Sequence, residues 1–237
     1  MDRGKIIVIE GTDCSGKETQ TKRLIKKLEE DGSKVVSFSF PNYDSPTGKI
    51  VGGPYLGKPE IGESYFGEAA LTLDPRITSL YYAADRKYNL TEVNNYLDQG
   101  YFVILDRYVS SNQAHQGGKL SDFNDRKAIY EWIDKLEYGL LELPKPDITI
   151  FLHVPYVYAK ELKKNRKNLD IHEKSPEHLM NAERSYLELA NIYNWNTIEC
   201  IHLGNLRTID DIGDEIYSKV KDLSKEKGKA YTLKKES

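Results

Sequence analysis

A glycine-rich loop near the start of the chain limits the folds that this sequence can adopt. Residues 11–19 read Gly-Thr-Asp-Cys-Ser-Gly-Lys-Glu-Thr, directly after the apolar run Ile6–Ile9 and just before an amphipathic stretch, Thr19–Glu30. The pattern G-x-x-x-x-G-K between a strand and a helix is typical of a loop whose backbone N–H groups surround phosphate oxygens. Lys17 adds a full positive charge. The sequence therefore predicts that this loop binds a nucleoside polyphosphate.

The position after Lys17 departs from the usual pattern. A Ser or Thr normally stands there with its hydroxyl on Mg²⁺, but this chain has Glu18, and the hydroxyl comes one place later, at Thr19. A Glu cannot replace that neutral ligand beside crowded phosphates, so we expect the metal to be held through water or other carboxylates. This argues against a GTPase-like switch and is compatible with a small-molecule kinase.

The rest of the chain alternates between β-rich and helical patterns. Apolar segments that predict strands are Ile6–Ile9, Val35–Phe40, Tyr101–Leu105, Ile148–Val154 and Thr197–Leu203. Helical patterns between and after them are Thr19–Glu30, Ile77–Tyr88, Thr91–Gln99, Phe123–Leu141, Tyr156–Arg166, Pro176–Tyr193 and Ile209–Val220. Such alternation predicts an α/β fold with a parallel sheet covered by helices on both faces. Ligands then bind at the carboxyl ends of the strands, where the phosphate-binding loop lies.

Composition narrows the class of protein further. The 237 residues, 39% of them hydrophobic, fit one domain over residues 1–223, followed by a Lys-rich and flexible tail, residues 224–237. The formal net charge of −3 predicts no nucleic-acid partner, and no apolar run is long enough to predict a membrane span. Cys14 and Cys200 cannot form a disulfide framework or a zinc site, which favours a reducing, cytoplasmic setting.

A second polar cluster follows the predicted strand Tyr101–Leu105. It begins Asp106-Arg107-Tyr108 and continues to Gly117. Asp and Arg at the end of a buried strand are costly unless they meet ions or each other. An internal Asp–Arg pair that only closes the loop is one interpretation. We favour a phosphate contact by Arg107 with Asp106 near its counter-ion, because the ends of parallel strands converge.

From Ile6 to about Leu203 the sequence resembles the thymidylate kinase family. The resemblance rests on motifs in the family's order: Gly11–Lys17 with an internal Asp13, Phe40-Pro41-Asn42-Tyr43-Asp44-Ser45, Tyr82-Ala-Ala-Asp85-Arg86, Asp106-Arg107-Tyr108, Leu143-Pro-Lys-Pro-Asp147 and Leu169-Asp-Ile-His-Glu173. It implies a P-loop three-layer sandwich with a five-stranded parallel sheet in the order 2-3-1-4-5 and a short mobile lid at about 160–175. It also implies transfer of the γ-phosphate of ATP to dTMP, giving dTDP, with Mg²⁺.

The resemblance assigns an acceptor site residue by residue. Tyr82 would stack on the thymine ring, and Arg86, one helical turn later on the same face, would donate to a thymine carbonyl. Arg107 would bind the dTMP phosphate. Residues that would line the nucleoside pocket or contact the base and sugar are Phe40, Pro41, Tyr43, Ser111, Asn112, His115 and Gln116. Position 115 is often aromatic in relatives, where it crowds a ribose 2′-hydroxyl.

The resemblance likewise implies a donor site and a source of catalytic charge. ATP would bind at Gly11, Thr12, Asp13, Cys14, Ser15, Gly16, Lys17, Glu18 and Thr19. Asp13 would also reach the sugar 3′-hydroxyl or a magnesium-bound water. Some relatives carry a catalytic Arg inside this loop, where this chain has Cys14, and others supply it from the lid. We therefore expect Arg166 of the lid, with Lys164 second, to act beside Lys17 and Arg107.

Other functions stay open on the sequence. A monophosphate kinase of broader base choice would accept dUMP or dGMP, and the Tyr82 and Arg86 pair does not exclude it. A deoxynucleoside kinase would need a carboxylate base near the second strand, where Asp44 is the candidate. A nucleotide-binding regulator without activity is the third alternative, favoured only by Glu18.

Three further expectations complete the sequence-based picture. His153, His172, His178 and His202 have no metal-ligand spacing and are expected to be structural or surface residues. The family implies a homodimer. The loop at residues 204–207 is a positional prediction for part of the adenine site.

Overall fold

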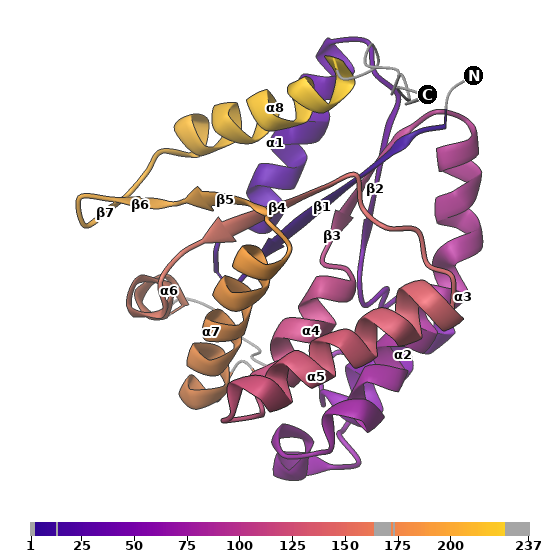
Figure 1. Cartoon of the computed structure of the whole chain (residues 1–237), viewed down its shortest axis with the longest axis vertical. Helices are drawn as coiled ribbons and strands as arrows, with labels where there is room; N and C mark the ends of the chain where they lie inside the picture. Colours follow the sequence, from indigo (N-terminus) through magenta and orange to yellow (C-terminus); the bar gives the residue numbers. More distant parts are fainter. Residues whose placement is uncertain (1–2, 13, 164–171, 173, 226–237) are drawn as a thin grey trace, which may run out of the picture.

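A five-stranded parallel sheet forms the centre of the computed structural model (Figure 1). The structure describes residues 3–12, 14–163, 172 and 174–225. The strands lie in the order β2-β3-β1-β4-β5, which confirms the expected order. Their bounds are β1 Lys5–Gly11, β2 Val35–Ser39, β3 Phe102–Asp106, β4 Ile148–His153 and β5 Asn196–Glu199.

Helices cover both faces of the sheet and make two separate cores. Side chains that alternate along β1 point to opposite faces, as the period of a strand requires. Ile6 and Val8 belong to the core with α3 (Pro75–Asp98), α4 (Val109–Gly117), α5 (Phe123–Asp134) and α7 (Pro176–Ile192). Ile7 and Ile9 belong to the core with α1 (Lys17–Glu30) and α8 (Ile209–Lys225). Figure 1 shows α1 and α8 together on one side of the sheet and α4, α5 and α7 on the other. The three layers are those that the alternating sequence predicts.

The helices agree with the predicted ones in place, with differences at their bounds. Those flanking the sheet are α1 Lys17–Glu30, α3 Pro75–Asp98, α4 Val109–Gly117, α5 Phe123–Asp134, α6 Tyr156–Lys163, α7 Pro176–Ile192 and α8 Ile209–Lys225. The stretches predicted as Ile77–Tyr88 and Thr91–Gln99 form one continuous helix, α3. Asn89 is buried there and donates to the Asp85 carbonyl, so a polar residue on the inner face interrupts the apolar pattern without breaking the helix.

Other predicted bounds were wrong for local reasons. The helix predicted over Phe123–Leu141 ends at Asp134 and continues as a π-helical segment, Lys135–Leu140. The strand predicted over Thr197–Leu203 leaves the sheet after Glu199. Ile201–His202 (β6) instead pairs antiparallel with Asn205–Leu206 (β7), because Leu203 and Gly204 both take positive φ values, 47° and 79°, and reverse the chain.

Two segments did not stand out in the sequence. Helix α4 follows β3 directly, and residues 46–71 form α2 Pro46–Ile50, a π-helical turn Val51–Tyr55 and a 3-10 turn Gly67–Leu71. Val51, Tyr55, Leu56 and Ala70 make a small third core there. At the other end, α8 extends to Lys225, so residues 224–225 are helical and the predicted tail from 226 lies outside the described residues.

In the part of the chain that the structure describes, no helix combines the length and apolar character that a membrane span needs.

His153, at the end of β4, predicts a pH-dependent stability. Its ring bonds Glu183 of α7 through Nε2 at 3.1 Å and Glu199 of β5 through Nδ1 at 2.7 Å. The bond to Glu183 raises the pKa of His153, burial opposes this, and Glu199 adds to the rise. Because the pKa of His153 is higher in the folded than in the unfolded state, its protonated ring stabilises the fold. This stabilisation is complete at pH values below the unfolded-state pKa of about 6.5, and it is lost as the pH rises through the folded-state pKa.

We expect wild type to exceed His153→Gln in unfolding free energy by on the order of 1 kcal/mol at pH 5.5, and by less at pH 9. Urea unfolding at the two pH values measures the difference. His202→Gln, at an exposed histidine, serves as the control and should show no such change. A constant difference between wild type and His153→Gln would contradict the prediction.

Candidate active site

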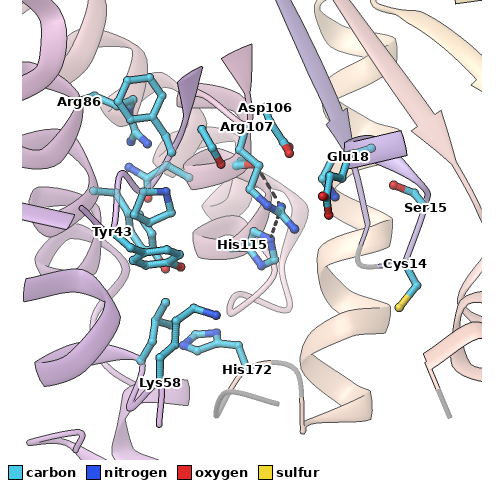
Figure 2. Close-up of a pocket in the computed structure, with 18 of the residues that line it drawn as sticks. Cys14, Ser15, Glu18, Tyr43, Lys58, Arg86, Asp106, Arg107, His115 and His172 are labelled. Atoms are coloured by element: carbon cyan, nitrogen blue, oxygen red, sulfur yellow. Dashed lines mark hydrogen bonds between the residues drawn. The ribbon is translucent and has the colours of Figure 1, made fainter. Parts of the chain in front are cut away.

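The loops that follow three neighbouring strands meet at one edge of the sheet. Ile9 of β1 lies opposite Asp106 of β3. The Arg107 N–H donates to the Ile9 carbonyl at 3.2 Å, and the Phe40 N–H donates to the Asp106 carbonyl at 3.0 Å. The ends of β1, β2 and β3 are thus tied together by the backbone. A pocket of about 500 Å³ opens at this edge (Figure 2).

The pocket collects most of the residues expected from the sequence. Predicted residues that line it are Cys14, Ser15, Gly16, Lys17, Glu18, Thr19, Phe40, Pro41, Tyr43, Tyr82, Arg86, Arg107, Ser111, Asn112, His115 and Gln116. Gly11 and Thr12 are not among the residues that line it. Asp13 and Arg166 lie outside the described residues, as does Lys164.

The glycine-rich loop of residues 11–19 has the left-handed backbone at Gly16 that its glycines predict. Gly16 precedes α1 with a φ of 82°, in the left-handed region that glycine adopts without strain, and Cys14 lies there too at 62°. A Cβ at Gly11 would lie only 2.9 Å from the Leu152 carbonyl oxygen, so β1 and β4 approach too closely for a side chain. Lys17 Nζ donates to the carbonyls of Gly11 and Thr12, at 2.9 and 3.1 Å. The loop thereby presents the positive end of α1 and an ammonium group to the pocket.

Arg107 is held in the pocket by hydroxyl groups and a histidine. Its φ of 66° is unusual for a residue with a side chain and aims the guanidinium across the strand end. Nη1 donates to the Tyr186 hydroxyl at 3.1 Å and to Ser111 Oγ at 3.3 Å, and it lies 3.4 Å from His115 Nε2 (Figure 2). Arg107 is therefore a positioned cation at the edge where the strands end.

Glu10, which the sequence analysis did not identify, organises the groups around Arg107. This residue of β1 is fully buried. Its carboxylate accepts from Ser110 Oγ and Ser111 Oγ, each at 2.7 Å, and from the Tyr186 hydroxyl at 3.1 Å. The hydroxyls of Ser111 and Tyr186, which lie 2.8 Å apart, also accept from Arg107 Nη1, so they link Glu10 to the guanidinium. The signal in the sequence was a lone carboxylate at the end of an apolar strand.

Asp85 holds the loop after β2 against α3. Asp85 is 1% exposed. Its carboxylate accepts from the Asn42 N–H at 2.8 Å, Ser45 Oγ at 3.0 Å and Thr47 Oγ1 at 2.9 Å. Ser45 in turn caps α2 through the Gly48 N–H. The motif around Tyr82 and the motif around Tyr43 thus form one unit, which places both aromatic rings on the pocket wall.

Arg86 meets a carboxylate that the sequence analysis did not identify. Its Nε and Nη2 donate to the two oxygens of Glu137, from the π-helical segment Lys135–Leu140. Arg86 is 3% exposed and Glu137 is fully buried. Burial alone would lower the pKa of Arg86, but Glu137 offsets it and the pKa is raised, so the guanidinium stays charged. Asn112 Nδ2 also donates to Glu137, at 2.9 Å.

His172 is buried and lines the pocket, a position that the sequence analysis did not predict for it. Its Nδ1 lies 2.9 Å from Nε2 of buried His178, which also lies 3.1 Å from His115 Nδ1. Its Nε2 lies 3.0 Å from the Tyr55 hydroxyl. Asp106, which the sequence placed near a counter-ion, also lines the pocket, and the lining residues that the analysis did not select are Ser39, Leu56, Lys58 and Leu162. The isolated histidines gave no spacing signal because they come from three different segments.

Two buried oxygens at this edge suit a hydrated cation. Asp106 Oδ1 and Ser15 Oγ are buried and have no hydrogen-bond partner within the described ranges. Those ranges contain no group of three His, Cys, Asp or Glu side chains arranged to bind a metal ion. A Mg²⁺ that keeps its waters and binds phosphates needs only one or two protein ligands, so the residues present fit such an ion.

Comparisons with known proteins agree with the motifs. The sequence model of thymidylate kinase matches residues 9–202. A thymidylate kinase of Prochlorococcus marinus (strain NATL2A) is 33% identical over 235 residues, 95% of this chain and all of that protein. A thymidylate kinase of Plasmodium falciparum is 30% identical over 220 residues, covering 92% of this chain and 90% of the relative.

A solved structure is similar as well. The thymidylate kinase of Candida albicans superposes with a TM-score of 0.69 at 26% identity, over 94% of this chain and 93% of that one. That protein is described as having broad substrate specificity.

Proposed function

We propose how this pocket works from the premise that the chain belongs to the thymidylate kinase family and transfers the γ-phosphate of ATP to dTMP, giving dTDP. One observation carries the proposal. Lys17 and Arg107, two cations suited to phosphates, line the same pocket as Tyr82 and Arg86, which suit a pyrimidine base. A single pocket of this kind can hold a donor phosphate and an acceptor nucleotide together.

The donor and acceptor phosphates are assigned to the carboxyl ends of β1 and β3. The loop of residues 11–19 would bind the ATP phosphates through its backbone, with Lys17 as the cation. Arg107 would bind the acceptor phosphate. That phosphate is already an anionic nucleophile, so the transfer requires no general base. The residues of the pocket act by aligning two phosphate groups that repel each other and by offsetting their charge.

Mg²⁺ and a lid cation complete the proposed charge balance. Mg²⁺, when bound, would neutralise charge on the ATP phosphates, with Asp106 and Ser15 the described residues that fit its waters. Asp13 is the further candidate. For the cation on the migrating phosphoryl group, the prediction remains Arg166, with Lys164 second. One domain over residues 1–223, with a lid at about 160–175, also remains a prediction. Lid closure would exclude water and so limit ATP hydrolysis.

The acceptor nucleoside is assigned to the other end of the pocket. Tyr82 would stack on thymine, Arg86 would donate to one of its carbonyls, and Phe40 and Pro41 would form the adjacent wall. Tyr43, Ser111, Asn112, His115 and Gln116 are the remaining proposed contacts, to the base and the sugar.

The acceptor assignment is tested by offering dTMP, dUMP, dGMP, UMP and thymidine with ATP and Mg²⁺ and measuring ADP release. We expect strong turnover with dTMP and little with any other acceptor except dUMP. Comparable turnover with dGMP would indicate a broader monophosphate kinase. Turnover with thymidine would show that the accepting group is a hydroxyl and not a phosphate, which would contradict the assignment of Arg107 to the acceptor phosphate.

Replacement of Arg107 tests the acceptor-phosphate contact directly. Arg107→Ala should lower kcat/KM for dTMP by about a hundredfold or more, since a positioned cation on a phosphate is lost. The Kd of a non-hydrolysable ATP analogue, measured by calorimetry, should change less than twofold. Arg76→Ala, an exposed arginine outside the pocket, is the matched control and should keep normal turnover. Normal turnover of Arg107→Ala would contradict the assignment of Arg107 to the acceptor phosphate.

We also infer a homodimer and a cytoplasmic location. Helix α3 carries exposed apolar side chains at Ile77, Leu80 and Tyr88, which suit a subunit contact. Sedimentation of the full chain tests this, and a monomer at micromolar concentration would contradict it. Cys14 and Cys200 are both free thiols, as expected of a protein in a reducing compartment.

A further inference from the structure

Glu137 makes hydrogen bonds that set the direction of two other side chains. Its carboxylate is fully buried and receives Arg86 Nη2 at 2.6 Å, Arg86 Nε, and Asn112 Nδ2 at 2.9 Å. A carboxylate paired with a guanidinium accepts hydrogen bonds and donates none. Each group that touches Glu137 must therefore turn a donor toward it.

This requirement orients Asn112. Both donors of its amide are used, because Nδ2 donates to Glu137 Oε1 and, at 3.4 Å, to the Ser79 carbonyl. A flipped amide would place Oδ1 against two acceptors, which is unfavourable. Oδ1 therefore points away from them. It is buried, with no hydrogen-bond partner in the described part of the chain, in a residue that is 2% exposed and lines the pocket.

The same requirement orients Arg86. Glu137 engages Nε and Nη2 side-on, so Nη1 is the nitrogen that it leaves for another acceptor. Arg86 lines the pocket beside Asn112. Glu137 thus fixes two residues that line the base end of the pocket: Arg86, with Nη1 left as a donor, and Asn112, with Oδ1 left as a buried acceptor turned away from Glu137. Gln116 differs, because neither its Oε1 nor its Nε2 has a partner in the described part of the chain, so it can turn either way.

We propose that Glu137 is a specificity-determining positioning residue, which selects a 2,4-dioxopyrimidine by holding Arg86 as donor and Asn112 as acceptor. The inference rests on the proposed acceptor site. In thymine an N3–H donor lies between two carbonyl acceptors, which complements Asn112 Oδ1 and Arg86 Nη1. In cytosine the two roles are reversed: N3 is an acceptor and would face Asn112 Oδ1, and the 4-amino group is a donor and would face Arg86 Nη1. Such discrimination is strong because the wrong base leaves a buried donor facing a donor and a buried acceptor facing an acceptor.

Stability alone does not account for a carboxylate at position 137. A buried ion pair is often no more stabilising than an apolar pair of similar size, because both charges lose their water. What an acceptor-only group provides here, and an apolar one does not, is a defined direction for the Asn112 amide. This is the physical reason to assign Glu137 to recognition.

Replacement of Glu137 by Gln tests the proposal. Gln carries an amide NH₂ that would face a donor of Arg86 or Asn112, so the Asn112 amide is released to flip. We expect kcat/KM for dTMP, divided by that for dCMP, to fall about tenfold or more. The KM for ATP should change less than twofold. Initial rates of ADP release with each acceptor give these values.

Glu188→Gln provides a matched control. Glu188 binds Arg126 in the same side-on geometry, at 2.9 Å from Nε and 2.7 Å from Nη2, but neither residue lines the pocket. This variant should lose stability and keep the dTMP-to-dCMP ratio. Glu137→Asp retains an acceptor-only carboxylate and should recover much of the ratio lost in Glu137→Gln. An unchanged ratio in Glu137→Gln, or an equal fall in Glu188→Gln, would overturn the proposal.

Two further variants keep the test decisive. If Glu137→Gln is too unstable to assay, Asn112→Ala removes the oriented acceptor while the Arg86–Glu137 pair stays, and the ratio should fall there too; an unchanged ratio overturns the proposal. Tyr82→Ala separates the inference from its premise. A raised KM for dTMP in Tyr82→Ala with an unchanged ratio in Glu137→Gln would refute only the role of Glu137. An unchanged KM in Tyr82→Ala would refute the acceptor site itself.

Discussion

The parallel pairing of β1 with β3 is the constraint on which the site depends. Because Ile9 lies opposite Asp106, the phosphate-binding loop and Arg107 leave the sheet at the same edge. Parallel strands place all their carboxyl ends together, so residues about a hundred positions apart in the sequence reach one pocket. The backbone bonds from Arg107 to Ile9 and from Phe40 to Asp106 then bring the loop after β2 to the same place.

Buried carboxylates orient the walls of this pocket. Glu10, Asp85 and Glu137 are each almost fully buried, and each accepts several hydrogen bonds from groups at the pocket edge. Glu10 orients the hydroxyls around Arg107, Asp85 holds the loop after β2, and Glu137 orients Arg86 and Asn112. A carboxylate suits this task because it accepts in several directions and cannot reverse its polarity while ionised.

Many residues of the candidate site could be predicted because they lie in short sequence motifs with a defined spacing. Lys17 is marked by glycines with a defined spacing, and Arg107 stands directly after an apolar strand. The carboxylates that orient other side chains were harder to find. Glu137 lies in a segment that reads as an ordinary helix, and its partners, Arg86 and Asn112, are 51 and 25 positions away. The place of His172 in the pocket was likewise hidden by its distance in sequence from His115.

By itself, the sequence determined the local elements, the parallel α/β architecture and the glycine-rich turn that joins β1 to α1. Strand and helix periods, glycine turns and apolar runs act over a few residues, and the printed chain contains them in full. Tertiary structure alone decided where β5 ends, that α3 is continuous, and which donors meet Glu10, Asp85 and Glu137. Those outcomes depend on hydrogen bonds between segments far apart in the chain, and a buried carboxylate is satisfied only once the fold has brought its partners to it.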